Sequence, residues 1–249
     1  MKAGKFVVVL LSILLLTAVQ VAAESSAKQC AEISVVNSFL APEQPHGLTF
    51  DGEHLYCAGR ESYPSNIYKL DMAGNVLDSF EGTGSVTGLA YKDGNIWAAT
   101  DNHLTISELS PSGEVLQTFD APGTDSTGLV FQHNALWNAD FNWDEPVAYL
   151  HRIMFTGKKM IVNTYESPGG APEGLAFDGQ HLWHVDYSSS KLYKLNPATK
   201  IKCEYDVPAI PDGDSYVIGV NPIGLTFDGT YLWMSMEDSH MIYQLDIGE

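Results

Sequence analysis

The chain has 249 residues, of which 31 are acidic and 13 are Lys or Arg, so its formal net charge at pH 7 is −18. A surface this acidic disfavours binding to nucleic acid and to anionic membranes, because both require clusters of Lys and Arg. Cations and basic partners remain compatible with the charge, which can also serve solubility alone.

The first residues are predicted to be an export signal. Two lysines precede an apolar run from Phe6 to Ala18, and Val21-Ala22-Ala23 offers small residues for cleavage. The run is short for a membrane span, although a retained anchor helix is the alternative. We therefore expect a signal peptide at residues 1–23 and a single secreted or periplasmic domain at 24–249. The mature chain is expected to be a monomer that does not insert into membranes.

Three cysteines follow the signal: Cys30, Cys57 and Cys203. In an oxidising compartment two of them could pair and leave one free. Ala27-Lys28-Gln29 lacks the Leu and small residues that precede a lipid-modified cysteine, so lipidation of Cys30 is not expected. Cys57 and Cys203 lie in apparent strand cores, where a cysteine usually acts as a small hydrophobic residue. The pairing stays open.

A short pattern occurs five times: Gly-Leu-x-Phe/Tyr, a tight turn, then Leu/Ile-Trp/Tyr. The successive copies are 41, 40, 46 and 50 residues apart and begin at Gly47, Gly88, Gly128, Gly174 and Gly224. A period in the forties with several short strands per unit is typical of a β-propeller. The sequence therefore predicts an all-β fold, a five-bladed β-propeller.

The first repeat predicts a blade of four strands. Its expected strands are Gly47–Phe50, His54–Ala58, Asn66–Leu70 and Val76–Phe80. Asp51-Gly52 predicts a two-residue hairpin after the inner strand. The inner glycine is expected to allow close approach of backbones at the axis, and the aromatic residue of the second strand is expected to pack between blades.

Two loops are longer than the repeat requires. Phe141 to Pro146 extends repeat three, and Ile210 to Asn221 separates repeats four and five. The second loop contains Asp212-Gly213-Asp214, a fragment of a calcium-loop pattern without its remaining ligands. Long loops on a rigid repeat usually carry function, so Trp143 and Tyr216 are candidate ligand contacts.

Repeat five ends at Glu249 after its third strand. The missing fourth strand is predicted at the other end of the chain, where Ile33–Phe39 matches the pattern of Val76–Phe80. Pairing of this segment with Met241–Ile247 would close the ring and remove exposed strand edges.

The residue before each Gly-Leu pair varies, and it is expected to surround the mouth of the axial channel on what we call the top face. An outer ring is expected from the loops after the second strands. The inner ring comprises His46, Thr87, Thr127, Glu173 and Ile223; the outer ring comprises Arg60, Glu61, Asp101, Asp140, Asp186, Glu237 and Asp238.

These rings allow more than one interpretation. His46 and Glu173, with two threonine hydroxyls, could hold a hard cation such as Ca²⁺, or they could form a hydrogen-bonded closure of the channel. Asp140 and Asp186 could contact a ligand, or they could cap loops by accepting backbone N–H groups in Asx turns.

The repeat resembles that of exported bacterial propellers with NHL- or YVTN-like units, on phrases such as Pro172 to Gly179 and Leu182-Trp183. Gly224 to Ser235 is also similar to a repeat of the five-bladed glutaminyl cyclases (glutamine cyclotransferases). That resemblance implies conversion of amino-terminal glutamine to pyroglutamate with help from a central acid, for which Glu173 is the matching residue. The Asn-Glu-Leu and Trp-Gln-Thr-Asp segments of those enzymes have no counterpart here.

Gluconolactonase-like propellers are similar as well. They have six blades and bind a divalent metal through acidic or Asn residues before similar glycines. At those positions this chain offers Glu173 as its one acid, beside His46 and two threonines.

We therefore predict a binding protein that presents an acidic, partly aromatic top face to a cationic small molecule, a peptide or a protein. The expected contacts are His46, Glu173, Asp140, Trp143, Asp186 and Tyr216. The alternative is an enzyme of the cyclotransferase or lactonase kind, with Glu173 as general acid/base. A purely structural role through the outer strands is a third possibility.

Overall fold

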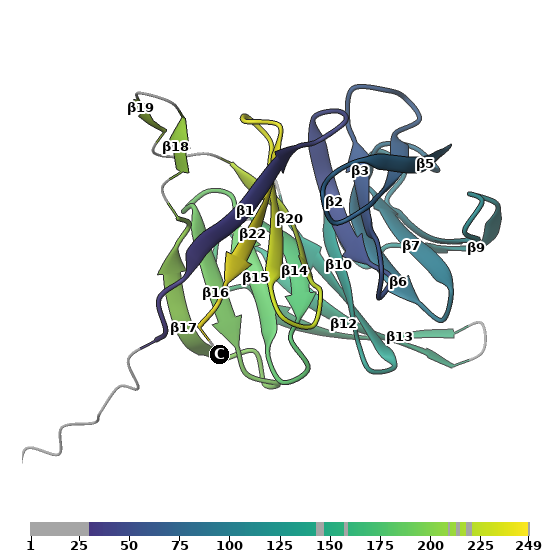
Figure 1. Cartoon of the computed structure of the whole chain (residues 1–249). Coiled ribbons are helices and arrows are strands. Elements are labelled where there is room, and N and C mark those ends of the chain that lie inside the picture. Colours follow the sequence, from purple (N-terminus) through teal and green to yellow (C-terminus); the bar gives the residue numbers. More distant parts are fainter. Residues whose placement is uncertain are drawn as a thin grey trace, which may run out of the picture.

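The structure is a computed structural model and shows five four-stranded antiparallel sheets arranged as blades around an axis (Figure 1). The predicted five-bladed β-propeller is confirmed. The part of the chain described contains no helix capable of spanning a membrane. The signal predicted at residues 1–23 lies outside that part. Described are residues 30–142, 147–156, 159–208, 210–212, 215–217 and 221–248, with the backbone alone at 210–212 and 215–217.

The first four blades are each built from four consecutive strands, running from the axis outward. Blade 1 contains β2 (Pro45–Phe50), β3 (Leu55–Gly59), β4 (Asn66–Leu70) and β5 (Val76–Glu81). Blade 2 contains β6 (Val86–Lys92), β7 (Asn95–Thr100), β8 (Thr105–Leu109) and β9 (Val115–Asp120). Blade 3 contains β10 (Ser126–Gln132), β11 (Ala135–Asp140), β12 (Tyr149–Thr156) and β13 (Lys159–Glu166). Blade 4 contains β14 (Pro172–Phe177), β15 (Leu182–Asp186), β16 (Lys191–Leu195) and β17 (Ile201–Asp206).

Blade 5 joins the two ends of the chain. Its inner three strands come last in the sequence: β20 (Pro222–Phe227), β21 (Leu232–Met236) and β22 (Met241–Asp246). The outer strand is β1 (Ser34–Leu40), which pairs antiparallel with β22 and brings Ser38 opposite Tyr243 (Figure 1). The prediction that the N-terminal strand completes the last blade is confirmed.

The inner glycines allow the blades to meet at the axis. A Cβ on Gly88 would collide with the carbonyl oxygen of Thr127, and one on Gly128 would collide with that of Glu173. The five Gly-Leu pairs leave no space for water between them, so the axis is closed at their level. The close approach predicted for these glycines explains why no larger residue fits there.

The turns between the first two strands of a blade differ from the prediction in part. Asp51 begins a four-residue turn, because its Oδ1 accepts the N–H groups of Glu53 (2.8 Å) and His54 (2.6 Å). Two-residue turns follow Lys92 in blade 2 and Gln132 in blade 3. An Asx turn thus replaces the hairpin expected at Asp51-Gly52.

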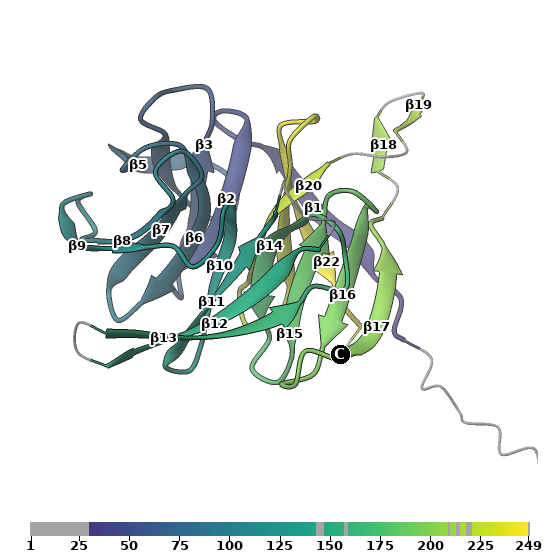
Figure 2. The ribbon, with the colours of Figure 1, turned by 180° about the vertical axis from the view of Figure 1, so that it is seen from behind.

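A disulfide joins Cys30, just before β1, to Cys203 in β17 of blade 4. Cys203 therefore lies in an outer strand and is not the core residue that its sequence context suggested, whereas Cys57 is buried and free. The segment between blades 4 and 5 is not a plain loop, because β18 (Ile210–Asp212) and β19 (Ser215–Val217) pair as a small hairpin that projects away from the blades (Figure 2).

Candidate functional site

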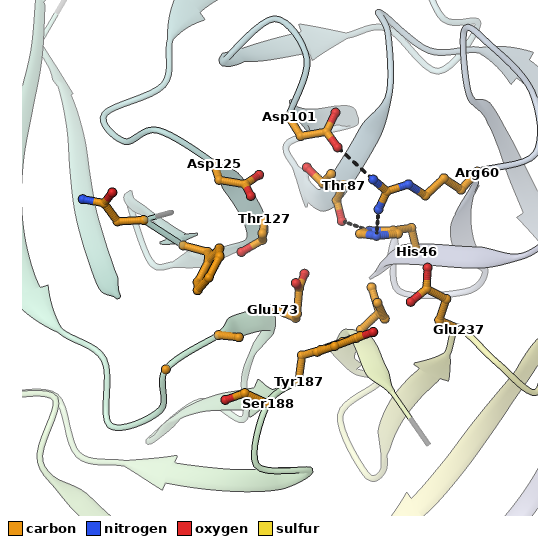
Figure 3. Close-up of a pocket in the computed structure, with 15 residues that line it drawn as sticks. His46, Arg60, Thr87, Asp101, Asp125, Thr127, Glu173, Tyr187, Ser188 and Glu237 are labelled. Atoms are coloured by element: carbon orange, nitrogen blue, oxygen red, sulfur yellow. Dashed lines mark hydrogen bonds and ion pairs between the residues drawn. The ribbon is translucent and has the colours of Figure 1, made fainter. Parts of the chain in front are cut away.

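The inner ring predicted from the sequence lines a cavity of about 820 Å³ on the top face (Figure 3). Each inner strand has a bulge around the residue before its glycine, as between Pro45 and Leu48 in β2. A bulge redirects a side chain. The lining residues are His46, Arg60, Thr87, Asp101, Asp125, Thr127, Phe141, Asn142, Gly170, Ala171, Glu173, Tyr187, Ser188, Ile223 and Glu237. Because the Gly-Leu pairs close the axis beneath it, the cavity ends blindly.

His46 is held between its neighbours and is neutral. Arg60 can only donate hydrogen bonds, so Nε2 of His46 accepts from its Nη1 (2.6 Å), and Nδ1–H donates to the carbonyl oxygen of Thr87 (2.9 Å). Burial, and then the charge of Arg60, lower the pKa of His46 to about 4. Arg60 also forms an ion pair with Asp101 (3.0 Å). Both nitrogens of His46 are therefore occupied.

Side chains at the axis form hydrogen bonds across four of the five blade junctions. The two threonine hydroxyls of the inner ring take part as donors, so they have no proton left for a ligand. No side chain of β14 or β20 makes an equivalent bond across the junction of blades 4 and 5 in the described part of the chain. The four bonds are His46 to Thr87 O (2.9 Å), Thr87 to Ser126 O (2.6 Å), Thr127 to Pro172 O (2.7 Å) and Ser235 to His46 O (2.7 Å).

Glu173 occupies the inner-ring position of blade 4, and its carboxyl group points toward the middle of the cavity (Figure 3). This carboxyl makes no hydrogen bond or ion pair with any described residue. Burial raises the pKa of Glu173 well above its ordinary value of 4.5, and the charge of Asp125 adds to the increase. Arg60 opposes the increase, and Glu237 contributes to it. The cavity therefore contains a carboxyl group that favours the protonated form.

The remaining lining mixes charged and apolar groups. Asp125 and Glu237 add negative charge, whereas Phe141 and Ile223 are apolar. Tyr187 lies near Glu173 at the rim, and burial raises the pKa of its hydroxyl. The cavity is thus acidic with apolar patches, a combination that suits a small organic cation.

Asp140 and Asp186, both predicted contacts, lie outside the cavity lining. Asp140 accepts the N–H groups of Thr124 (2.8 Å) and Asp125 (2.9 Å). Asp186 accepts those of Ala171 (2.7 Å) and Ser189 (2.8 Å). Both residues are almost completely buried. They cap the loops before the inner strands, which is the alternative that the sequence had left open.

Of the other predicted contacts, two line the cavity and the side chains of two lie outside the described part of the chain. His46 and Glu173 line the cavity together, whereas Trp143 and the side chain of Tyr216 lie outside the described part of the chain. Asp125 and Tyr187 line the cavity but were not predicted. Tyr187 directly follows Asp186, so counting one residue beyond the capping aspartate would have found it.

The geometry does not fit the predicted cation site. Neither nitrogen of His46 has a free lone pair, so His46 cannot act as a metal ligand in this arrangement. Among the described residues no three His, Cys, Asp or Glu side chains are grouped as a metal site would require. Ca²⁺ prefers six or more oxygen ligands, several of them carboxylates.

No protein-family model matches the sequence, and no curated protein is similar enough to count as a match. Among solved structures, a glutaminyl cyclase from Myxococcus xanthus superposes with a TM-score of 0.69 at 14% identity, over 87% of this chain and 97% of that one. A streptogramin B lyase gives 0.50 at 19% identity, over 90% of this chain and 100% of the other. A chain of a nidogen/laminin complex gives 0.56 at 20% identity, over 82% and 76%. At such identities the likeness shows a shared propeller fold.

Proposed function

We propose that the axial cavity binds a small ligand carrying an ammonium group, and that Glu173 is the counter-ion of that group. The observation that carries the proposal is the carboxyl of Glu173, which lies in the cavity without a partner in the described part of the chain. An unpaired carboxylate is costly to bury, and a bound ammonium would remove that cost.

The surroundings support a cationic ligand. Asp125 and Glu237 add negative charge to the cavity lining, and Phe141 and Ile223 provide apolar surface for a carbon chain. The inter-blade hydrogen bonds hold the inner ring in place, so little ordering is needed on binding. We further propose that the protein acts outside the cytoplasm, since the Cys30–Cys203 disulfide suits an oxidising compartment.

Calorimetric titration with pentylamine tests the proposal. We expect binding to the wild-type protein, and at least a tenfold loss of affinity in Glu173→Gln, which keeps the shape but removes the ionised form. Glu53→Gln is the matched control, since Glu53 is 83% exposed in the turn at the opposite end of the inner strand. Equal affinity in the wild type and Glu173→Gln would refute the proposal.

A second candidate function is cyclisation of an amino-terminal glutamine. It is favoured by the raised pKa of Glu173 and by the fold shared with a glutaminyl cyclase. The α-amine of the substrate would attack its own side-chain amide carbon, and the C–N bond to the amide nitrogen would break to release ammonia. Ionised Glu173 would accept the proton of the attacking amine and return it to the leaving nitrogen.

Mass spectrometry of a glutaminyl tripeptide distinguishes the two candidates. Cyclisation predicts a loss of one ammonia from the peptide with wild-type protein and at least a hundredfold slower loss with Glu173→Gln. If the peptide binds but stays intact, the protein is a binding protein and this second function is wrong.

A further inference from the structure

Arg60 is the one permanent cation among the described residues that line the cavity. It follows β3 in blade 1, and its side chain is 38% exposed. Figure 3 shows its guanidinium at one side of the cavity, beside His46 and Asp101, with the carboxyl of Glu173 nearer the middle. The cavity therefore offers a ligand both a cationic donor group and a carboxyl group.

The guanidinium is held in a fixed orientation. Its Nη1 donates to Nε2 of His46 at 2.6 Å, and its Nη2 donates to Asp101 at 3.0 Å. His46 is fixed in turn by the carbonyl oxygen of Thr87. Two anchors on a planar group define the direction of every other N–H that it carries.

Arg60 keeps donors that no described residue accepts. A guanidinium has five N–H groups, and the side chains of His46 and Asp101 take two of them. The Nε–H and one N–H on each terminal nitrogen therefore remain available on a side chain that is partly open to the cavity. Such donors bind an oxygen acceptor on a ligand.

We propose that Arg60 determines ligand specificity by binding an uncharged carbonyl oxygen that lies next to the ligand's ammonium group. This inference rests on the proposed role of Glu173 as the ammonium partner. It narrows the ligand class from amines in general to α-amino carbonyl compounds such as amino acid amides and esters. A free carboxylate fits less well, because Asp101 already balances Arg60 and because Asp125 and Glu237 would repel it.

Two probes that differ in one group test the inference. Norleucinamide is pentylamine with a carboxamide on the carbon that bears the amine. For the wild type we expect norleucinamide to bind about tenfold or more tightly than pentylamine, as a hydrogen bond to a charged group allows. Norleucine, with a carboxylate in place of the amide, should bind more weakly than norleucinamide.

The double variant Arg60→Met/Asp101→Asn removes the donors and keeps the net charge of the cavity unchanged. We expect the preference for norleucinamide over pentylamine to fall to about onefold. Arg60→Lys, which keeps the charge and loses the planar donors, is the second variant and should lose most of the preference. Thermal unfolding shows whether the double variant and Arg60→Lys are folded, and the binding preference is compared in the variant that is.

The possible results distinguish a failure of the role of Arg60 from a failure of the proposed ammonium site at Glu173. A preference that persists in the double variant, or equal binding of the two probes to the wild type, overturns the role of Arg60 and leaves the ammonium site intact. If neither probe binds to the wild type, the ammonium site itself is refuted, and the inference fails with it.

Discussion

The residue before each inner glycine has two different roles in this ring. In blades 1, 2 and 3 the side chains of His46, Thr87 and Thr127 donate hydrogen bonds to the next blade. In blade 4 the same position holds Glu173, which makes no such bond with a described residue. Glu173, like the apolar Ile223 at this position in blade 5, therefore does not join its blade to the next, and its carboxyl faces the cavity.

Replacing Glu173 by Gln should stabilise the protein at high pH. The folded state keeps the proton of Glu173 to a higher pH than the unfolded chain does, because burial raises its pKa. The free energy of unfolding of the wild type therefore decreases as pH rises above the ordinary Glu value of 4.5. The Gln side chain of the variant does not titrate, so the variant does not undergo this decrease. We expect a gain of about 1 kcal/mol, or roughly 2–4 °C in Tm, for Glu173→Gln at pH 8.

At pH 4 most of the difference should disappear, since Glu173 is then mostly protonated in both the folded and the unfolded state. Thermal unfolding of both proteins between pH 4 and pH 8 measures it. A gain that is the same at every pH would contradict the assignment of a raised pKa.

The indole N–H of Trp97 lacks a hydrogen-bond acceptor in the described chain, and a single substitution can provide one. This buried Nε1–H has no hydrogen-bond partner among the described residues, whereas the equivalent Trp137 donates to Gln132 Oε1 at 2.8 Å. Lys92 occupies the place of Gln132 before a turn of the same length. We expect Lys92→Gln to raise the free energy of unfolding by about 1 kcal/mol in urea titrations.

Lys92→Met is the control, since it removes the same charge without adding an acceptor. The ion pair that both changes remove, between Lys92 and Asp93 at 3.7 Å, is at the surface and contributes little. Equal stability of the two variants would show that the indole partner has no effect.

At the scale of the strand and the turn, the period of the repeat predicted the blades well because each blade needs the same glycine and the same aromatic column. The structure confirms both, with Trp137, Trp183 and Trp233 almost completely buried. The turn at Asp51 could not be predicted from its Asp-Gly pair. Its length depends on whether the aspartate side chain accepts backbone N–H groups, and several turns satisfy that pair.

The roles of Asp140 and Asp186 also depend on contacts that the repeat does not encode. A Cβ on Gly123 would collide with the carboxylate of Asp140, and one on Gly169 would collide with that of Asp186. In blades 3 and 4, therefore, a glycine before the inner strand accompanies a capping aspartate in the second strand. Position in the repeat alone suggested a ligand contact, because it showed which residues reach the top face and not what holds them there.

The close contact of the inner strands predicts a strong effect of one methyl group. We expect Gly128→Ala to lower the free energy of unfolding by about 1–3 kcal/mol, because its Cβ would collide with the carbonyl oxygen of Glu173. The strand must shift to accommodate the methyl group, and pentylamine affinity should fall with it. Urea unfolding and calorimetry measure the two effects.

Gly170→Ala is the matched control at the same face. Among the described residues its Cβ would meet Ser188 Oγ alone, at an ordinary 3.5 Å, so little loss of stability is expected. If both alanine variants were equally stable, the inner strands would have to be less tightly packed than they are here.

For the whole molecule, the junction of blades 4 and 5 differs from the other four. Within the described chain, its inner strands β14 and β20 have no side-chain hydrogen bond across the axis. The Cys30–Cys203 disulfide links the same two blades at their outer edge, since Cys30 precedes the outer strand of blade 5. The sequence predicted the closing strand but left the cysteine pairing open, because pairing depends on which outer strand passes close to Cys30.

Removing the disulfide should therefore weaken closure of the ring. We expect Cys30→Ser/Cys203→Ser to lower the free energy of unfolding by about 2–5 kcal/mol, because the link spans 173 residues of chain. Tryptophan fluorescence in guanidinium chloride measures it. A reductant should shift the wild type toward the double variant and leave the double variant unchanged; a wild type that is insensitive to reductant would contradict this role.

The five Gly-Leu pairs determine whether a molecule can pass through the centre of the ring. Because they seal the middle of the propeller, no molecule can thread from one side to the other. Whatever enters must leave by the same mouth, so an extended polymer can insert no more than a terminus or a single projecting group.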